Sequence, residues 1–155
     1  MIDGAGRAIA NAQRLVAAAE LFGVPVSYTE QNAKGLGPTL PDLPAPADAV
    51  VHKMSFDATR AGGLLGRIAE HHSVVVSGCE AHVCVLQTVL GLREAGRQVY
   101  VVRDAIGSRR PENKAEALRR MARHGAEIVT TEMVVFEWLE TAEHPRFKEA
   151  IALIK

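Results

Sequence analysis

A chain of 155 residues with 48% hydrophobic content is long enough to bury the core of one domain, so we expect a single domain over residues 1–155. The 18 basic and 18 acidic residues give a formal net charge of zero, which argues against nucleic acid and anionic membranes as partners. No apolar run approaches the roughly 20 residues of a membrane span, and Cys79 and Cys84 lie too close in sequence to staple a secreted fold, so we expect a soluble, cytoplasmic protein.

The first part of the chain has the pattern of a helix, a strand and a loop. The spacing predicts a helix over residues 5–22 that Gly23 ends, followed by a strand over residues 24–30. Residues 32–48 lack helical periodicity and hold four prolines, which are typical of a surface loop. The predicted helix has one face with Ile9, Ala12, Val16 and Ala19.

The remainder of the chain alternates short β-rich runs with longer segments of helical period. We expect the run "SVVVSG" to be a buried central strand, followed by a helix from Cys84 to Ala95 with Gly96 as its cap. This alternation predicts an α/β fold, a three-layer sandwich with a central, mostly parallel sheet flanked by helices. The other predicted strands cover residues 49–52, 98–102 and 126–130, and the other predicted helices cover residues 58–70, 111–124, 132–141 and 145–154.

Cys84 stands at the position where functional groups gather in such folds, since it follows a strand that ends near Gly78 and opens a helix. The positive end of the helix dipole and the free amides of the first turn stabilise a thiolate there, which makes the cysteine a good nucleophile. The alternative interpretation, that Cys84 is simply a small buried hydrophobic residue, is equally compatible with the spacing.

Four ordered motifs resemble those of the isochorismatase-like cysteine hydrolases, in particular the isochorismatase domain-containing proteins. They are "TEQNAKGLGPT", "HKMSFD", "GCEAHVCV" and "DAIGSR", and the similarity extends to the ending "HPRFKEAIALIK". The resemblance implies an isochorismatase-like, Rossmann-like fold and a catalytic triad of Asp, Lys and Cys, with Cys84 as the nucleophile and Lys53 as the lysine. It implies covalent catalysis on a small amide, imide or related substrate. The alternative for Lys53 is a side chain that merely extends from a strand end to solvent.

The resemblance also implies an oxyanion hole made by the backbone amides of Glu80 and Cys84, with a cis peptide bond between Cys79 and Glu80. Glu80 and His82 either contact substrate or orient the loop, and short polar residues at such junctions often only satisfy backbone groups. For Asp104 and Arg109 we favour a structural role, bracing the neighbouring strand end, over contact with substrate.

The chain departs from the family at its first residues. Members normally begin with a buried strand that carries the catalytic aspartate, whereas here the chain starts with "MIDGAGRAIA". Asp3 follows no strand, and "IDGAG" fits better as the loop before the first helix, so we do not assign Asp3 as the catalytic acid. Three explanations are compatible with this start: a truncation at the start site, an expression fragment and a degenerate paralogue. The intact mass of the protein from its natural source tests them, because a mass above 16.7 kDa would show that the natural protein is longer.

We expect no metal and no cofactor, because "TEQNAKGLGPT" lacks the histidines of nicotinamidase metal sites and the six histidines show no ligand spacing. The expected partners are a small-molecule substrate and further copies of the chain in a homo-oligomer. An apolar face could form the contact between copies, or it could equally be buried within one subunit. Two other hypotheses remain: a non-catalytic binding or scaffolding protein, and a thiol redox sensor that uses Cys79 and Cys84. The apolar face comprises Met133, Val135, Phe136 and Trp138.

Overall fold

The first helix of the chain lies where its sequence pattern predicts it. In the computed structural model, which describes all 155 residues, α1 covers Ala5–Phe22, and Gly23 caps it in a left-handed conformation (φ +69°). Its most buried apolar side chains are Ala8, Ala12, Leu15, Ala18 and Ala19. The predicted face is therefore half right, since Ala12 and Ala19 are buried whereas Ile9 and Val16 are only partly so.

The strands form two separate parallel sheets instead of the single predicted one. The larger sheet has the order β3 (Val74–Cys79), β4 (Val99–Gly107) and β5 (Glu127–Val129), and the smaller sheet pairs β1 (Tyr28–Gln31) with β2 (Val50–Lys53). The prediction that "SVVVSG" is a buried central strand is wrong, because β3 has a partner on one side only and its valines are half-buried. The central strand is β4.

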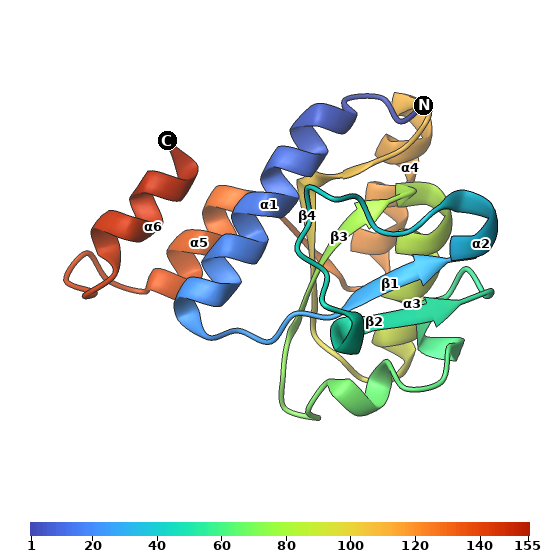
Figure 1. Ribbon diagram of the computed structural model, residues 1–155, viewed down its shortest axis with the longest axis horizontal. Coiled ribbons are helices and arrows are strands. Elements are labelled where there is room, and N and C mark those ends of the chain that lie inside the picture. Colours follow the sequence, from blue (N-terminus) through green and yellow to red (C-terminus); the bar gives the residue numbers. More distant parts are fainter.

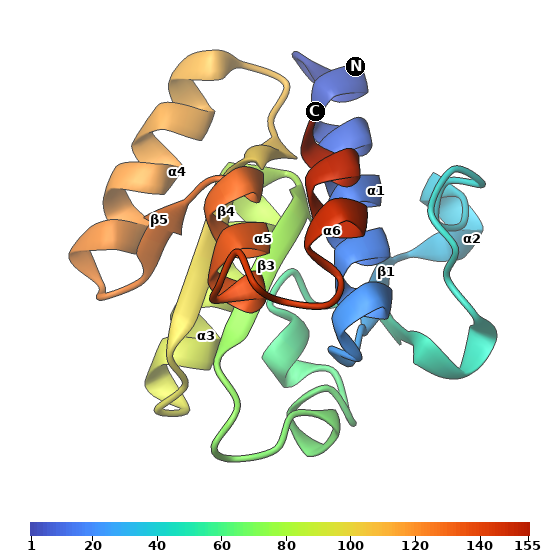
Figure 2. The same ribbon diagram turned by 90° about the vertical axis from the view of Figure 1, so that its left-hand side faces the viewer.

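Helices cover both faces of the larger sheet, as Figures 1 and 2 show. On one face lie α1 and α5 (Thr131–Leu139), with α6 (Phe147–Ile154) packed against these two helices, and on the other lie α3 (Leu86–Glu94) and α4 (Pro111–Arg123). Successive β4 side chains point to opposite faces, so Val101 packs in the cluster with α3 and α4, and Val102 in the cluster with α1 and α5. The prediction of an α/β fold with parallel strands between helical layers is confirmed.

One helix prediction is wrong, and another differs in where its α-helix begins. The predicted helix over residues 58–70 is two single 3₁₀ turns, Ala58–Arg60 and Leu65–Arg67, because the intervening Gly63 takes a φ of +103° that no α-helix contains. The helix expected from Cys84 begins at Leu86 and is preceded by a π-helical turn, Ala81–Val85. Cys84 is thus the fourth residue of a π turn, a distortion often found at functional sites.

The loop with four prolines is as irregular as its composition predicts. It contains only the one-turn helix α2 (Ala33–Leu36) and a 3₁₀ turn, Ala47–Ala49, before β2 begins. The chain has no helix with the length and hydrophobicity required to cross a lipid bilayer.

Candidate active site

Three side chains from separate elements meet at the carboxyl ends of the strands. Gln31 ends β1 and is the register partner of Lys53, which ends β2. Cys84 comes from the π turn that follows β3. Parallel strands place their carboxyl ends at one edge, and this topology brings together a lysine and a cysteine that are 31 positions apart in the sequence.

Lys53 is buried, with 7% of its surface exposed, and neutral oxygens alone receive its hydrogen bonds. Its Nζ donates to Gln31 Oε1 at 2.8 Å and to the carbonyl oxygens of Ser55 and Phe56, both at 3.1 Å. No carboxylate forms an ion pair with it. These three acceptors satisfy the hydrogens of an ammonium group but leave its positive charge without a counter-ion. The alternative that Lys53 extends from its strand end to solvent does not describe this environment.

Cys84 is half-buried, and its Sγ lies 4.0 Å from Gln31 Oε1, the oxygen that also accepts from Lys53. The peptide bond between Cys79 and Glu80 is cis, as the family resemblance implies. The Glu80 carbonyl accepts from the amides of Val83 and Val85, whereas the Glu80 amide donates no hydrogen bond within the protein. The geometry thus leaves a free backbone donor at the turn that carries the thiol.

The sequence analysis missed Gln31, which contacts both candidate catalytic side chains. Its Nε2 donates to the Met54 carbonyl at 2.7 Å, while its Oε1 faces Lys53 and Cys84. Its position held a usable signal, since it is the last residue of β1 at the same sheet edge as Lys53. Sequence alone did not indicate that the side chain turns toward the π turn.

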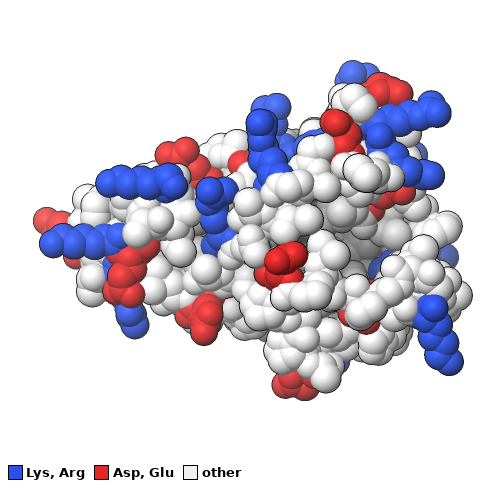
Figure 3. All heavy atoms as spheres, turned by 45° about the horizontal axis from the view of Figure 1, so that its top comes forward, with Lys and Arg blue, Asp and Glu red and all other residues white.

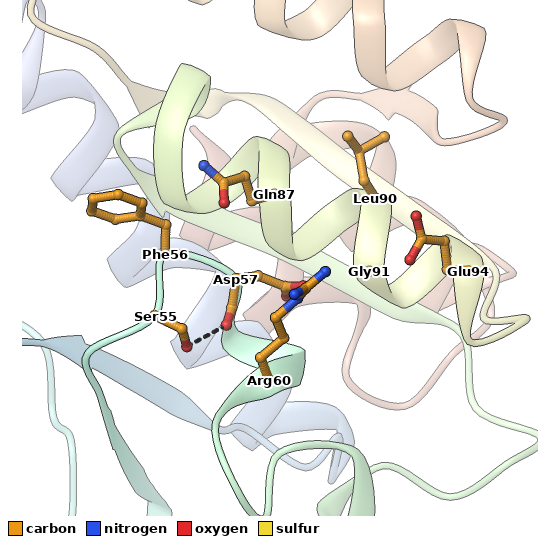
Figure 4. A pocket seen from close by; sticks show the side chains of 8 residues that line it. All are labelled: Ser55, Phe56, Asp57, Arg60, Gln87, Leu90, Gly91 and Glu94. Carbon is orange, nitrogen blue, oxygen red and sulfur yellow. Dashed lines mark hydrogen bonds and ion pairs between the residues drawn. The ribbon is translucent and has the colours of Figure 1, made fainter.

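The segment after Lys53 is anchored on α3, the helix that continues from the π turn of Cys84 (Figure 4). Ser55 Oγ donates to the Asp57 carbonyl at 2.7 Å, and the Ala58 amide donates to Thr88 Oγ1 of α3 at 3.0 Å. Asp57 also lies directly against Gly91 of α3. The carbonyls that hold Lys53 are therefore positioned by the same helix that positions Cys84. A hollow of about 320 Å³ opens between this segment and α3.

Glu80 and His82 are both tied to the segment that follows β4. Glu80 Oε2 accepts from the amide and the Nε of Arg109 at 3.0 and 3.1 Å, and His82 Nδ1 lies 3.0 Å from Oγ of the buried Ser108. Partial burial opposes ionisation of Glu80, but the hydrogen bonds and charge of Arg109 outweigh it and lower the pKa of this carboxyl. These contacts favour loop orientation as the role of Glu80.

Asp104 has structural contacts, and Asp3 is not joined to the candidate site. Asp104 Oδ1 accepts from the amide and hydroxyl of Thr131 at the start of α5, which agrees with a bracing role. The Asp3 amide donates to the Ser108 carbonyl, and its carboxylate forms no hydrogen bond with Lys53 or Cys84. No carboxylate of the chain takes the position of a triad acid beside the thiol.

Cys79 and Cys84 are both free thiols. Although Cys79 as a whole residue is exposed, desolvation of its thiol, reinforced by the charges of Glu80 and Cys84, raises its pKa. A thiol with a raised pKa is a poor nucleophile at neutral pH, which disfavours Cys79 as a partner in redox chemistry. Nowhere in the chain do three or more His, Cys, Asp or Glu side chains come together as a group suited to a metal ion.

Comparison with known proteins identifies the family. The family model of the Isochorismatase domain matches residues 2–133. The chain belongs to this family. Isochorismatase domain-containing protein 2A of Mus musculus is 40% identical over 146 residues, which cover 93% of this chain and 70% of that protein. Isochorismatase domain-containing protein 1 of Danio rerio is 38% identical over 153 residues, covering 97% of this chain but 54% of that protein, so the chain spans about half of that relative.

Two solved structures share the fold. MAR1 ribonuclease from Caenorhabditis elegans superposes with a TM-score of 0.91 at 33% identity, over 99% of this chain and 81% of that chain. YcaC from Escherichia coli, described as an octameric hydrolase of unknown specificity, superposes with a TM-score of 0.82 at 23% identity, over 96% of this chain and 74% of that chain. At that identity the likeness to YcaC concerns the fold alone.

Proposed function

We propose that this isochorismatase-family chain is a cysteine-dependent hydrolase of a small amide, imide or related substrate. The observation that carries the proposal is the buried ammonium group of Lys53, which has no carboxylate partner and shares an oxygen acceptor with the Cys84 thiol. An uncompensated positive charge in a poorly solvated site favours a thiolate over a thiol and attracts developing negative charge. These are the requirements of a cysteine nucleophile that attacks a carbonyl carbon.

The proposed reaction has two steps. The Cys84 thiolate attacks the carbonyl carbon, the C–N bond breaks, and the nitrogen leaves after taking up a proton, so that a thioester remains on Cys84. Water then adds to the thioester, the C–S bond breaks, the carboxylic acid is released and the thiol is restored. Lys53 stabilises the thiolate before attack and the negative charge that develops on the carbonyl oxygen.

The amides of Glu80 and Cys84 form the oxyanion hole in this proposal. The Glu80 amide has no acceptor within the protein, and the peptide bond before it is cis. Glu80 and His82 hold the turn in place through Arg109 and Ser108, and the ring nitrogen of His82 that does not face Ser108 is available to substrate.

The proposed reaction needs a proton carrier, and no carboxylate contacts Cys84 or Lys53 to fill that role. By family resemblance it is an aspartate at the end of a parallel strand, and the strand edges that lack a partner belong to β1, β2, β3 and β5. An acid that serves both Cys84 and Lys53 has to approach beside β1 and β3, because Gln31 is the last residue of β1 and the π turn of Cys84 follows β3. A chain without such an acid is expected to form the thioester but to hydrolyse it slowly.

Acylation of the protein by p-nitrophenyl acetate tests the nucleophile. We expect a mass increase of one acetyl group on Cys84, located by peptide mass spectrometry, and its loss in Cys84→Ala without a change in the far-UV circular dichroism. Lys53→Met should slow acylation at neutral pH by about tenfold or more, because it removes the charge that stabilises the thiolate.

Cys79→Ala is the matched control, since it removes the other thiol and should acylate like the unmodified protein. Acylation that persists in Cys84→Ala, or that follows Cys79, would remove Cys84 from the mechanism. A Cys84 that reacts negligibly below pH 8 in the unmodified protein would instead favour a non-catalytic binding or scaffolding role.

RNA cleavage is the second candidate function, because the C. elegans relative of 33% identity is a MAR1 ribonuclease. Arg109 and Arg110 line a hollow of about 320 Å³ next to the turn of Cys84, but Arg109 is paired with Glu80, which leaves Arg110 as the cation for phosphate. Charges of both signs are interspersed over the face shown in Figure 3, however, and the formal net charge is zero. A labelled RNA that stays intact during incubation with the protein would exclude this candidate.

Two exposed apolar residues support a homo-oligomer as part of the proposal. Met133 and Phe136 of α5 are 46% and 44% exposed, whereas Val135 is buried and Trp138 half-buried within the subunit. The apolar face is therefore divided, and only its two exposed residues are available for association. Light scattering that gives the 16.7 kDa of one chain would contradict this part of the proposal.

A further inference from the structure

Gln31 is the side chain through which the Lys53 and Cys84 groups meet, and its amide orientation is fixed by chemistry. An ammonium group can only donate hydrogen bonds, so the atom 2.8 Å from Lys53 Nζ has to be the carbonyl oxygen. The amide nitrogen then points to the Met54 carbonyl, which accepts at 2.7 Å. The same oxygen therefore faces the Cys84 sulfur at 4.0 Å, the long end of the range for a thiol donor.

We propose that Gln31 is a positioning residue that holds the Lys53 ammonium beside Cys84 and accepts the hydrogen of the resting thiol. This inference rests on the proposed function and adds a residue to its mechanism. The amide of Gln31 satisfies one N–H of Lys53 without adding a negative charge of its own. A carboxylate at the same position would neutralise the ammonium group and repel the thiolate.

The proposal predicts shifts of opposite sign for two variants of similar side-chain length. In Gln31→Glu the added negative charge disfavours ionisation of Cys84, so the pH midpoint of its alkylation should rise by about one unit and the rate at pH 7 should fall about tenfold. In Gln31→Met the thiol loses its acceptor and Lys53 keeps its full charge with one N–H free to turn to the sulfur, so the midpoint should fall.

The measurement is the rate of carbamidomethylation of Cys84 by iodoacetamide between pH 5 and 10, followed by peptide mass spectrometry, which needs no substrate. Other titratable groups around Cys84 are Lys53 from β2, Cys79 from β3, Glu80 and His82 in the same turn, and Arg109 after β4. A Cys79→Ala background removes the second thiol, and the other groups are common to all variants.

Gln98→Glu is the matched control, because it makes the same change at the opposite, amino-terminal end of the larger sheet, where Gln98 contacts Tyr100 and Glu127. It should leave the midpoint of Cys84 unchanged. Shifts of the same sign in both Gln31 variants, or no shift in either, would overturn the positioning role while leaving Cys84 as nucleophile. A Cys84 that alkylates in no variant would instead overturn the proposed function.

Discussion

At the scale of single residues, the candidate site is distinguished by where charge is neutralised and where it is not. Glu80 is matched by Arg109 through two hydrogen bonds, whereas the buried Lys53 meets only neutral oxygens. Burying a cation without an anion costs free energy, so a lysine in this environment is explained more simply by chemistry than by stability. The proposed function therefore rests first on Lys53.

Glu80 gives a prediction on the pH dependence of stability. The pKa of Glu80 in the folded state is lowered below the ordinary 4.5, so between that lowered pKa and pH 4.5 the unfolded chain binds more protons than the folded protein. Folding therefore gains stability as the pH rises, and this gain is complete above pH 4.5. This gain is lost as the pH falls through the lowered pKa. We expect urea midpoints measured between pH 3 and 6 to fall less steeply in Glu80→Gln than in the unmodified protein. Identical slopes would show that the Arg109 contact does not form in solution.

At the scale of elements, the π turn and the segment after β2 form one unit because both are attached to α3. The Ala58 amide bonds to Thr88, and Asp57 and Thr59 lie against Gly91. This arrangement couples the position of Lys53 to that of Cys84 through α3. A change on α3, away from either side chain, should therefore disturb the site.

Gly91→Ala tests this coupling. A Cβ at position 91 would clash with Thr59 Oγ1 and lie 2.7 Å from Asp57 Oδ2, so the segment has to shift. We expect a loss of about 1–3 kcal/mol in the free energy of unfolding by urea, together with slower alkylation of Cys84. Gly66→Ala is the control, since no atom lies within 4 Å of the added Cβ, and it should be nearly neutral. Equal effects of both substitutions would contradict the coupling.

At the scale of the whole molecule, the division into two sheets predicts unequal local stability. Strand β4 pairs on both sides and packs between two helical layers, whereas β1 and β2 pair only with each other. Isolated two-stranded pairs are marginally stable. Hydrogen–deuterium exchange should therefore protect the amides of residues 99–102 longest and those of residues 28–31 and 50–53 much less. Equal protection of the two sheets would contradict a divided structure.

Local sequence signals located the helices and strands whose patterns depend on near neighbours. Helix α1 has the predicted bounds, and Pro111 opens α4 at the expected position. The helix predicted over residues 58–70 failed because the apolar spacing outweighed the glycines at 62, 63 and 66. The π turn at Cys84 was also missed, since its extra residue per turn leaves no mark on hydrophobic periodicity.

The sequence by itself determined the family, the α/β class and the candidate pair Lys53 and Cys84, because motifs and short-range periodicity are properties of the linear chain. Only the tertiary structure showed that β3 is an edge strand, that Lys53 is buried among neutral oxygens, and that Gln31 joins it to the thiol. Strand pairing, burial and side-chain direction depend on residues far apart in the chain. Their contacts come into existence only when the sheets and helices pack together.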